Sequence, residues 1–147
     1  MQKSYENIAV LATIDPVSQS AGSANTDVID TSLFEKVLFI VTVGALGASA
    51  TVDFLVKADS ASGGSFATTV TGKSITQLTK ADSDDNKQVL VEVDANALRA
   101  QNSSFRYIRG TITVAAAACL VSVVALGFGC TYGPANQYNL ASVDETK

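Results

Sequence analysis

The stretch that decides the fold is residues 105–129, FRYIRGTITVAAAACLVSVVALGFG. In residues 105–114, apolar or small side chains alternate with Arg and Thr, apart from a slip near residues 108–110, as in a strand with one buried face. Residues 119–128 are apolar on both faces, as expected of a strand buried between two layers. β-branched residues favour strands over helices in both halves. We therefore expect a hairpin joined by an alanine-rich connection.

A membrane-spanning helix is the alternative for part of this stretch, because residues 111–130 contain no charge over about the length of a span. The run is rich in Thr, Ser, Val and Ala, ends in Gly127 and Gly129, and has no aromatic belt. The apolar run within residues 1–14 is too short for a secretory signal, and acidic residues flank it. We therefore expect buried strands and no membrane partner.

Composition limits the class of protein. The chain has 147 residues, enough for one domain with a real core, and it is 47% hydrophobic, which makes disorder unfavourable. Its net charge of −4 argues against binding nucleic acid, which needs a basic face. Two cysteines, Cys119 and Cys130, are too few for a disulfide framework.

The remaining strands are short runs of apolar and β-branched residues separated by turn residues. They are expected at residues 7–14, 26–30, 34–43, 50–58, 66–70, 73–78 and 88–94. The turn at residues 44–47 should make a hairpin of 34–43 and 50–58, and Asp94 can cap a helical turn over residues 95–100. This pattern predicts an all-β fold, an antiparallel, jelly-roll-like β-sandwich of about eight strands with extended N- and C-terminal segments.

The predicted organisation has three parts. Residues 1–25 form an N-terminal arm and first strand, with a turn at Asp15-Pro16 and either a loop or an edge segment over residues 17–25. Residues 26–130 form the sandwich. Residues 131–147 form an extended C-terminal tail after the Gly133-Pro134 break.

Candidate catalytic chemistry is sparse. The absence of histidine removes the usual general base and most nucleophile pairs and zinc sites. Residues 82–86, DSDDN, resemble the start of a calcium loop, but Lys87 replaces its glycine and Val93 its glutamate. A glycosidase pair would have to come from Asp53, Glu92 and Asp94, which nothing in the sequence brings together. We expect no enzyme, no metal and no cofactor.

Aromatic residues outside the predicted core suggest a contact surface. Tyr5, Tyr132 and Tyr138 lie in the two terminal segments, and tyrosine is enriched in interfaces. The alternative is that these side chains fold back onto the sandwich. The candidate partner contacts are Tyr5, Tyr132, Asn136 and Tyr138.

Several segments carry a family resemblance. They are FEKVLFIVTVGAL (34–46), ATVDFLVKADSASGGSF (50–66), VLVEVD (89–94), FRYIR (105–109), LVSVVALG (120–127) and YGP (132–134). In this order, over roughly residues 25–134, the chain resembles small tailed-phage structural proteins encoded near the major capsid protein. The resemblance implies a β-sandwich on the virion, most often a head cement or decoration protein.

The resemblance also implies partners and a location. It implies a homo-oligomer, with a trimer favoured, that is made in the host cytoplasm and binds the major capsid protein on the capsid surface. The alternative is a tail, connector or receptor-binding module; a carbohydrate-facing version would need clustered exposed aromatics, and the chain has no Trp. A small hydrolase, the third possibility, would need a pocket with convergent acids. If both terminal segments carry the contacts, deleting either should leave a folded sandwich that no longer decorates particles.

Overall fold

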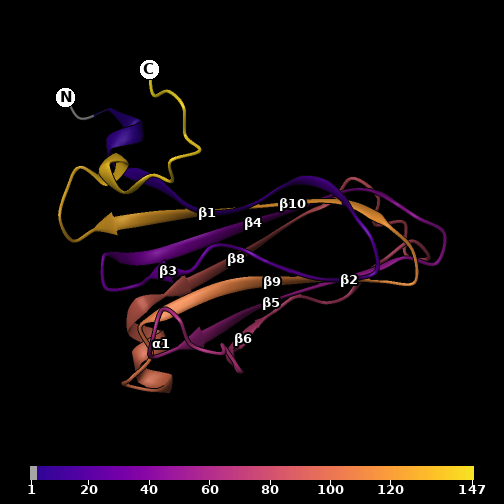
Figure 1. The fold of residues 1–147 in the computed structure, drawn as a ribbon, viewed down its shortest axis with the longest axis horizontal. Coiled ribbons are helices and arrows are strands. Elements are labelled where there is room, and N and C mark those ends of the chain that lie inside the picture. The colour runs from indigo at the N-terminus through magenta and orange to yellow at the C-terminus, as the bar shows by residue number, and fades with distance from the viewer. Residues whose placement is uncertain (1–2) are drawn as a thin grey trace.

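Two antiparallel sheets pack face to face in the computed structural model, which describes residues 3–147 (Figure 1). The first sheet has four strands in the order β1 (Ile8–Gln19), β10 (Cys119–Cys130), β4 (Phe34–Leu46) and β8 (Gln88–Asp94). The path of the second sheet is β2 (Gly22–Asn25), β9 (Tyr107–Ala115), β5 (Thr51–Asp59) and β6 (Thr68–Ser74). Two short strands complete it: β3 (Ile29–Asp30) pairs with β9, and β7 (Leu78–Thr79) pairs with β5.

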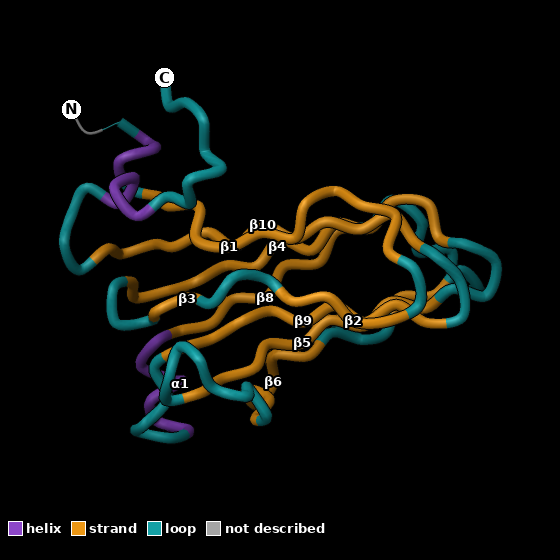
Figure 2. Tube along the Cα trace, in the orientation of Figure 1, coloured by secondary structure: helices purple, strands orange, loops and turns teal. Residues whose placement is uncertain are grey.

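The eight longer strands have jelly-roll connectivity. Along the chain they alternate between the two sheets, except that β5 and β6 follow one another in the same sheet and pair. The connections gather at the two ends of the strands, as Figure 2 shows. Two four-stranded sheets linked in this way form a jelly roll. The predicted antiparallel, jelly-roll-like sandwich of about eight strands is confirmed.

The core lies between the sheets and is built from the inward side chains of both. Phe39 of β4 and Phe54 of β5 meet there, with ring centroids 5.6 Å apart. Gly110 of β9 makes room for them, because a Cβ at this position would lie 2.6 Å from Phe54 Cζ. Ile108 also points inward and is fully buried, whereas Tyr107 is only half-buried. The alternation of β9 is therefore regular, and the predicted slip near residues 108–110 is wrong.

Neither predicted hairpin forms. β9 and β10 lie in different sheets, and so do β4 and β5. Their connections cross from one layer to the other, and the two crossings touch where Gly47 N donates to Ala118 O at 3.0 Å. A Cβ on Gly47 would lie 2.7 Å from the same oxygen, so only glycine fits this close approach. Side-chain alternation shows which face of a strand is buried but not which strand lies beside it, which is why the prediction failed.

The first strand is longer than predicted. β1 continues through Asp15 and Pro16 to Gln19, with a register shift between Ile14 and Val17. A proline is tolerated there because β1 is an edge strand with an irregularity at that point. Residues 17–25 then finish β1 and form β2, an edge strand of the second sheet, which agrees with the edge-segment alternative. Residues 8–25 therefore belong to the sandwich, and the expectation that the sandwich stays folded when residues 1–25 are deleted is wrong, because the deletion removes an edge strand from each sheet.

Two further local predictions have opposite outcomes. The helical turn after Asp94 is confirmed as α1 (Ala95–Gln101), and Asp94 Oδ1 accepts hydrogen bonds from the backbone N–H groups of Asn96 and Ala97 at 2.8 and 3.0 Å. The predicted break at residues 71–72 is wrong, because β6 continues through it with Gly72 at φ +71°. Glycine adopts this conformation without strain.

Four aspartates accept hydrogen bonds within the fold that favour their ionised form. Backbone N–H donors lower the pKa of Asp59 and Asp94, and the Lys80 ammonium followed by a backbone N–H lowers that of Asp85. Burial raises the pKa of Asp30, but hydrogen bonds led by those from Arg106 outweigh it and leave the pKa below its ordinary value. Arg106 holds Asp30 through a two-pronged pair, with Nη2 2.6 Å and Nε 3.0 Å from the carboxylate oxygens.

Acid is therefore expected to destabilise the protein. Because the folded pKa of each group lies below the unfolded value, each contributes stability that is complete above the unfolded pKa, near 3.8, and is lost as pH falls through the folded pKa. Thermal unfolding followed by circular dichroism should give a melting temperature that is steady from neutral pH to about pH 5 and falls below about pH 4. Asp94→Asn keeps a good helix cap and should reduce this acid dependence. A melting temperature that rises on acidification would contradict the assignment.

Candidate interaction surfaces

The terminal segments meet at one corner of the sandwich, beyond the paired ends of β1 and β10 (Figure 1). The N-terminal side contributes the short helix η1 (Ser4–Glu6), and the C-terminal side contributes η2 (Ala135–Tyr138). These two helices contact one another. The structure therefore brings the four candidate contact residues to one end of the molecule, and we call this region the terminal corner: Tyr5, Tyr132, Asn136 and Tyr138.

The four side chains differ in accessibility. The Tyr138 ring is half-buried and packs edge-on against Phe34 with centroids 5.7 Å apart, so it folds back onto the sandwich. Tyr5 is half-buried beneath the Lys3 ammonium, which lies 5.3 Å from the ring centroid. Asn136 is also half-buried, and its Oδ1 atom has no hydrogen-bond donor. Tyr132 is 67% exposed, whereas the other three side chains are half-buried.

The expected extended tail is packed over part of its length. Ala135 is buried, and residues 139–140 add to the free edge of β1. There, Val10 N donates to Asn139 Oδ1 at 2.8 Å and Leu140 N donates to Val10 O at 2.9 Å. An edge strand leaves backbone donors and acceptors unpaired, and the tail satisfies two of them. The polar sequence of this segment gave no sign of that role.

A second surface was missed by sequence reasoning. Nine outward side chains of the first sheet are apolar, and polar residues are concentrated in one row and at one end; we call this surface the apolar sheet face. In β10, Val121, Val123 and Ala125 are buried, while the residues between them are only half-buried or exposed. Leu90 of β8 is 63% exposed and Leu120 of β10 is 50% exposed. The face consists of Ile8, Val10, Leu38, Ile40, Leu90, Leu120, Val124, Leu126 and Phe128.

This arrangement corrects the prediction that residues 119–128 are buried on both faces. β10 and β4 are central strands of their sheet, as expected for β4, but only their inward faces are covered by the second sheet. A strand that is apolar on both faces indicates contacts on both sides. In this chain, the second contact is not made by another layer of the same sandwich.

The outer face of the second sheet is polar by contrast. Asp53 lies opposite Thr113, and Lys57 lies opposite Arg109. Ser23 and Thr113 share a hydrogen bond of 2.8 Å between their hydroxyl oxygens. A polar outer face is the ordinary condition of a sandwich in water. The apolar sheet face departs from it, and exposed apolar patches are typical of surfaces that contact a protein, a membrane or a ligand.

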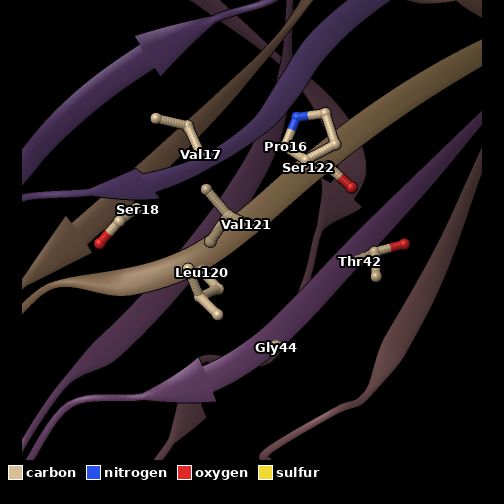
Figure 3. Close-up of a pocket in the computed structure, with 8 residues that line it drawn as sticks. All are labelled: Pro16, Val17, Ser18, Thr42, Gly44, Leu120, Val121 and Ser122. Carbon is tan, nitrogen blue, oxygen red and sulfur yellow. The ribbon is translucent and has the colours of Figure 1, made fainter.

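A shallow groove lies at one end of the apolar sheet face (Figure 3). It has a volume of about 290 Å³ and forms where Gly44 carries no side chain beside Leu120. A Cβ at Gly44 would lie 3.0 Å from Leu120 Cβ, so any other residue would crowd the leucine. The lining residues are Pro16, Val17, Ser18, Thr42, Gly44, Leu120, Val121 and Ser122.

The acidic candidates do not converge. Asp53 is on the outer face of the second sheet, where Gln77 Nε2 donates to it at 2.7 Å. Glu92 is on the apolar sheet face, 3.0 Å from Lys36 Nζ, and Asp94 caps α1. Asp53 and Glu92 therefore lie on opposite sides of the molecule.

The acidic turn at residues 82–86 serves the fold. Asp84 accepts a hydrogen bond from Thr79 N at 3.0 Å, and Asp85 accepts one from Leu46 N at 2.8 Å. Across residues 3–147, no three carboxylate or thiol side chains gather in a metal-binding group. Both thiols are free, and burial raises the pKa of the Cys119 thiol.

Residues 111–130, considered above as a membrane span, form parts of β9 and β10. In the described part of the chain, no helix has the length and apolar character needed to cross a bilayer. The fold and its surfaces define an all-β jelly-roll protein with one apolar and one polar outer face. Comparison with protein families, curated proteins and solved structures finds no match to this chain.

Proposed function

We propose that this protein is a structural component of a bacteriophage particle, a cement or decoration protein that binds the assembled head shell and stabilises it. The observation that carries the proposal is the apolar sheet face, because an apolar outer face indicates that the protein works within an assembly of several chains. The contact with the shell itself is assigned to the terminal corner. The resemblance to tailed-phage structural proteins is the reason for proposing that this assembly is a phage particle. Jelly rolls recur in viral capsid proteins and lectins, which is an analogy at the level of the fold.

The proposed role needs binding energy rather than chemistry. A protein that binds the assembled shell, and not its separate subunits, stabilises the shell by mass action. Many weak contacts on one particle add through multivalency. The partner in this role is the major capsid protein, and the site of action is the capsid surface.

The terminal corner is the proposed contact with the shell. Tyr132 is exposed there on a segment held by the buried Ala135. Exposed tyrosines that become buried on binding are frequent hot spots, because the ring adds large contact area at small entropic cost.

Tyr132→Ala is expected to weaken binding to expanded, undecorated phage shells about 10- to 30-fold, the loss typical of a hot-spot aromatic. The measurement is a saturation pull-down with purified shells, followed by heating of the decorated particles. The wild type should bind saturably and raise the shell melting temperature. The variant should keep its own melting temperature, because the side chain is exposed.

Thr113→Ala on the polar outer face is the matched control and should bind as the wild type does. Unchanged occupancy for Tyr132→Ala would contradict the role of the terminal corner. Absence of wild-type binding to shells, with the protein found at the tail or vertex of intact virions, would favour the tail, connector or receptor-binding alternative.

A further inference from the structure

We propose that the apolar sheet face is covered by a second copy of this chain, with the two sheets packed face to face about a two-fold axis. The inference rests on the proposed function as an assembly component, and it names the occupant of one surface. It gives a two-fold dimer in place of the trimer that the resemblance favours. Face-to-face packing of two sheets is the ordinary way in which apolar sheet faces are buried, at a separation of about 10 Å.

The strand registers arrange the face in rows that cross the sheet. The central row is Thr13, Val124, Ile40 and Leu90. On one side of it lie the row Val10, Leu126, Leu38 and Glu92 and then the row Ile8, Phe128, Lys36 and Asp94. On the other side lie Ser122, Thr42 and Gln88, followed by Leu120 beside Gly44.

A two-fold axis that lies between the sheets along the central row makes the face self-complementary. Each residue of that row then meets its own copy, so Ile40 meets Ile40 and Leu90 meets Leu90. Phe128 is four residues from Val124 in one direction along β10, and Leu120 is four residues away in the other. The axis therefore places Phe128 of each copy over Leu120 of its partner.

The groove beside Leu120 can receive that ring. Its volume of about 290 Å³ exceeds the roughly 150 Å³ of an engineered apolar cavity that binds benzene. Gly44 keeps it open. Phe128 is the largest apolar side chain of the face, and it lies at the end opposite the groove. Phe128 is half-buried, so part of its ring is accessible to the partner's groove, as this axis requires.

The charges agree with the same axis. The ionisable side chains of the five rows lie toward one end, where Lys36 Nζ is 3.0 Å from Glu92 Oε1 and Asp94 follows. Rotation about the central row brings Glu92 opposite the partner's Gln88 and Lys36 opposite the partner's Gly44, so no like charges meet. An axis parallel to the strands would instead place Glu92 over β1 of the partner, against Val10. Burying a carboxylate against an apolar residue is costly, so the first axis is favoured.

The size of the face sets the strength of the contact. Four strands about 4.8 Å apart and five rows spaced by two residues give roughly 500 Å² of flat area per copy, or about 1,000 Å² for both. That is the lower end of specific interfaces. We therefore expect a dimer that forms at high concentration and dissociates on dilution.

The chain's own tail is not the occupant. Its hydrogen bonds go to Val10 at the free edge of β1, and Tyr138 packs against Phe34. Leu90 is on β8, at the opposite edge of the same sheet, and stays exposed.

Sedimentation velocity on the full chain over a range of concentrations tests the proposal. The wild type should change from monomer to dimer. Leu90→Lys places two ammonium groups against each other on the axis and should raise the dissociation constant about 100-fold. Leu90 is 63% exposed, so the variant should fold, and circular dichroism checks this. Val28→Lys is the control, because Val28 is a large apolar residue that is exposed elsewhere and should leave the dissociation constant unchanged.

Cross-linking tests the axis itself. In a Cys130→Ser background, Leu90→Cys should be joined to its own copy by a short bis-maleimide, whereas Val28→Cys should not. A wild type that is monomeric at every concentration, a trimer, or a dimer that Leu90→Lys leaves intact would each overturn the proposal. Monomers that still saturate shells would overturn the dimer and leave the cement role intact. Dimers that bind no shells would support the dimer and contradict the cement role.

Discussion

Replacing Phe39 by alanine is expected to lower the free energy of unfolding by about 3–5 kcal/mol, the range for deleting a buried aromatic ring. Phe39 is fully buried at the middle of β4, a central strand of the first sheet. Its ring packs against Phe54 of the opposite sheet and lies beside Gly110, so it joins the two layers. The space left by the ring cannot be refilled, because its neighbours belong to strands held by hydrogen bonds on both sides.

The measurement is urea unfolding followed by far-ultraviolet circular dichroism at a fixed, low protein concentration. Phe39→Leu should cost less, about 1–2 kcal/mol, because most of the volume is kept. Leu90→Ala on the outer face should change the free energy of unfolding by less than about 0.5 kcal/mol. A loss below about 1 kcal/mol for Phe39→Ala would mean that this ring does not join the two sheets.

Deleting residues 133–147 is expected to lower the free energy of unfolding by about 3–4 kcal/mol. The deletion exposes Phe34, which is buried and has the Tyr138 ring against it. It also removes the two hydrogen bonds that residues 139–140 make with Val10. Loss of the half-buried tyrosine contributes about 1–2 kcal/mol, less than a fully buried side chain would, and each of the two hydrogen bonds contributes about 1 kcal/mol.

The matched truncation removes only residues 141–147. It keeps the contacts of Tyr138 and Leu140 and should change the free energy of unfolding by less than about 0.5 kcal/mol. The measurement is the free energy of unfolding in urea of the two truncated chains and of the full chain. If the longer deletion is as stable as the full chain, residues 133–147 behave as the free tail that the sequence predicts, and they are then available in full to a partner.

Local features of the fold could be predicted because they depend on neighbours in sequence. The strand at residues 88–94 matches β8, and the alternation of residues 50–58 places Val52, Phe54 and Val56 in the core as expected. The cap on α1 was also predictable, since Asp94 needs only the next few N–H groups. Turns at glycine were less reliable: Gly44 and Gly72 both lie within strands.

The candidate surfaces were only partly predictable. Tyr132 was expected to be a contact residue and is exposed, while Tyr138 was expected on the same grounds and packs against Phe34. Part of the apolar sheet face is the run from Leu120 to Phe128, whose apolar pattern predicts a strand covered on both sides. A strand covered by its own chain and a strand exposed for another copy show the same apolar pattern, so sequence alone does not separate them.

The sequence by itself determined the all-β class, the approximate number of strands and the inward side chains of β5 and β8, because these depend on side-chain alternation over a few residues. Only the tertiary structure decided that β9 and β10 lie in different sheets, that the tail pairs with β1, and that one outer face is apolar. The physical reason is that strand pairing joins residues far apart in the chain. Backbone hydrogen bonds are nearly the same for every partner, so the choice among partners is made by packing the whole core at once.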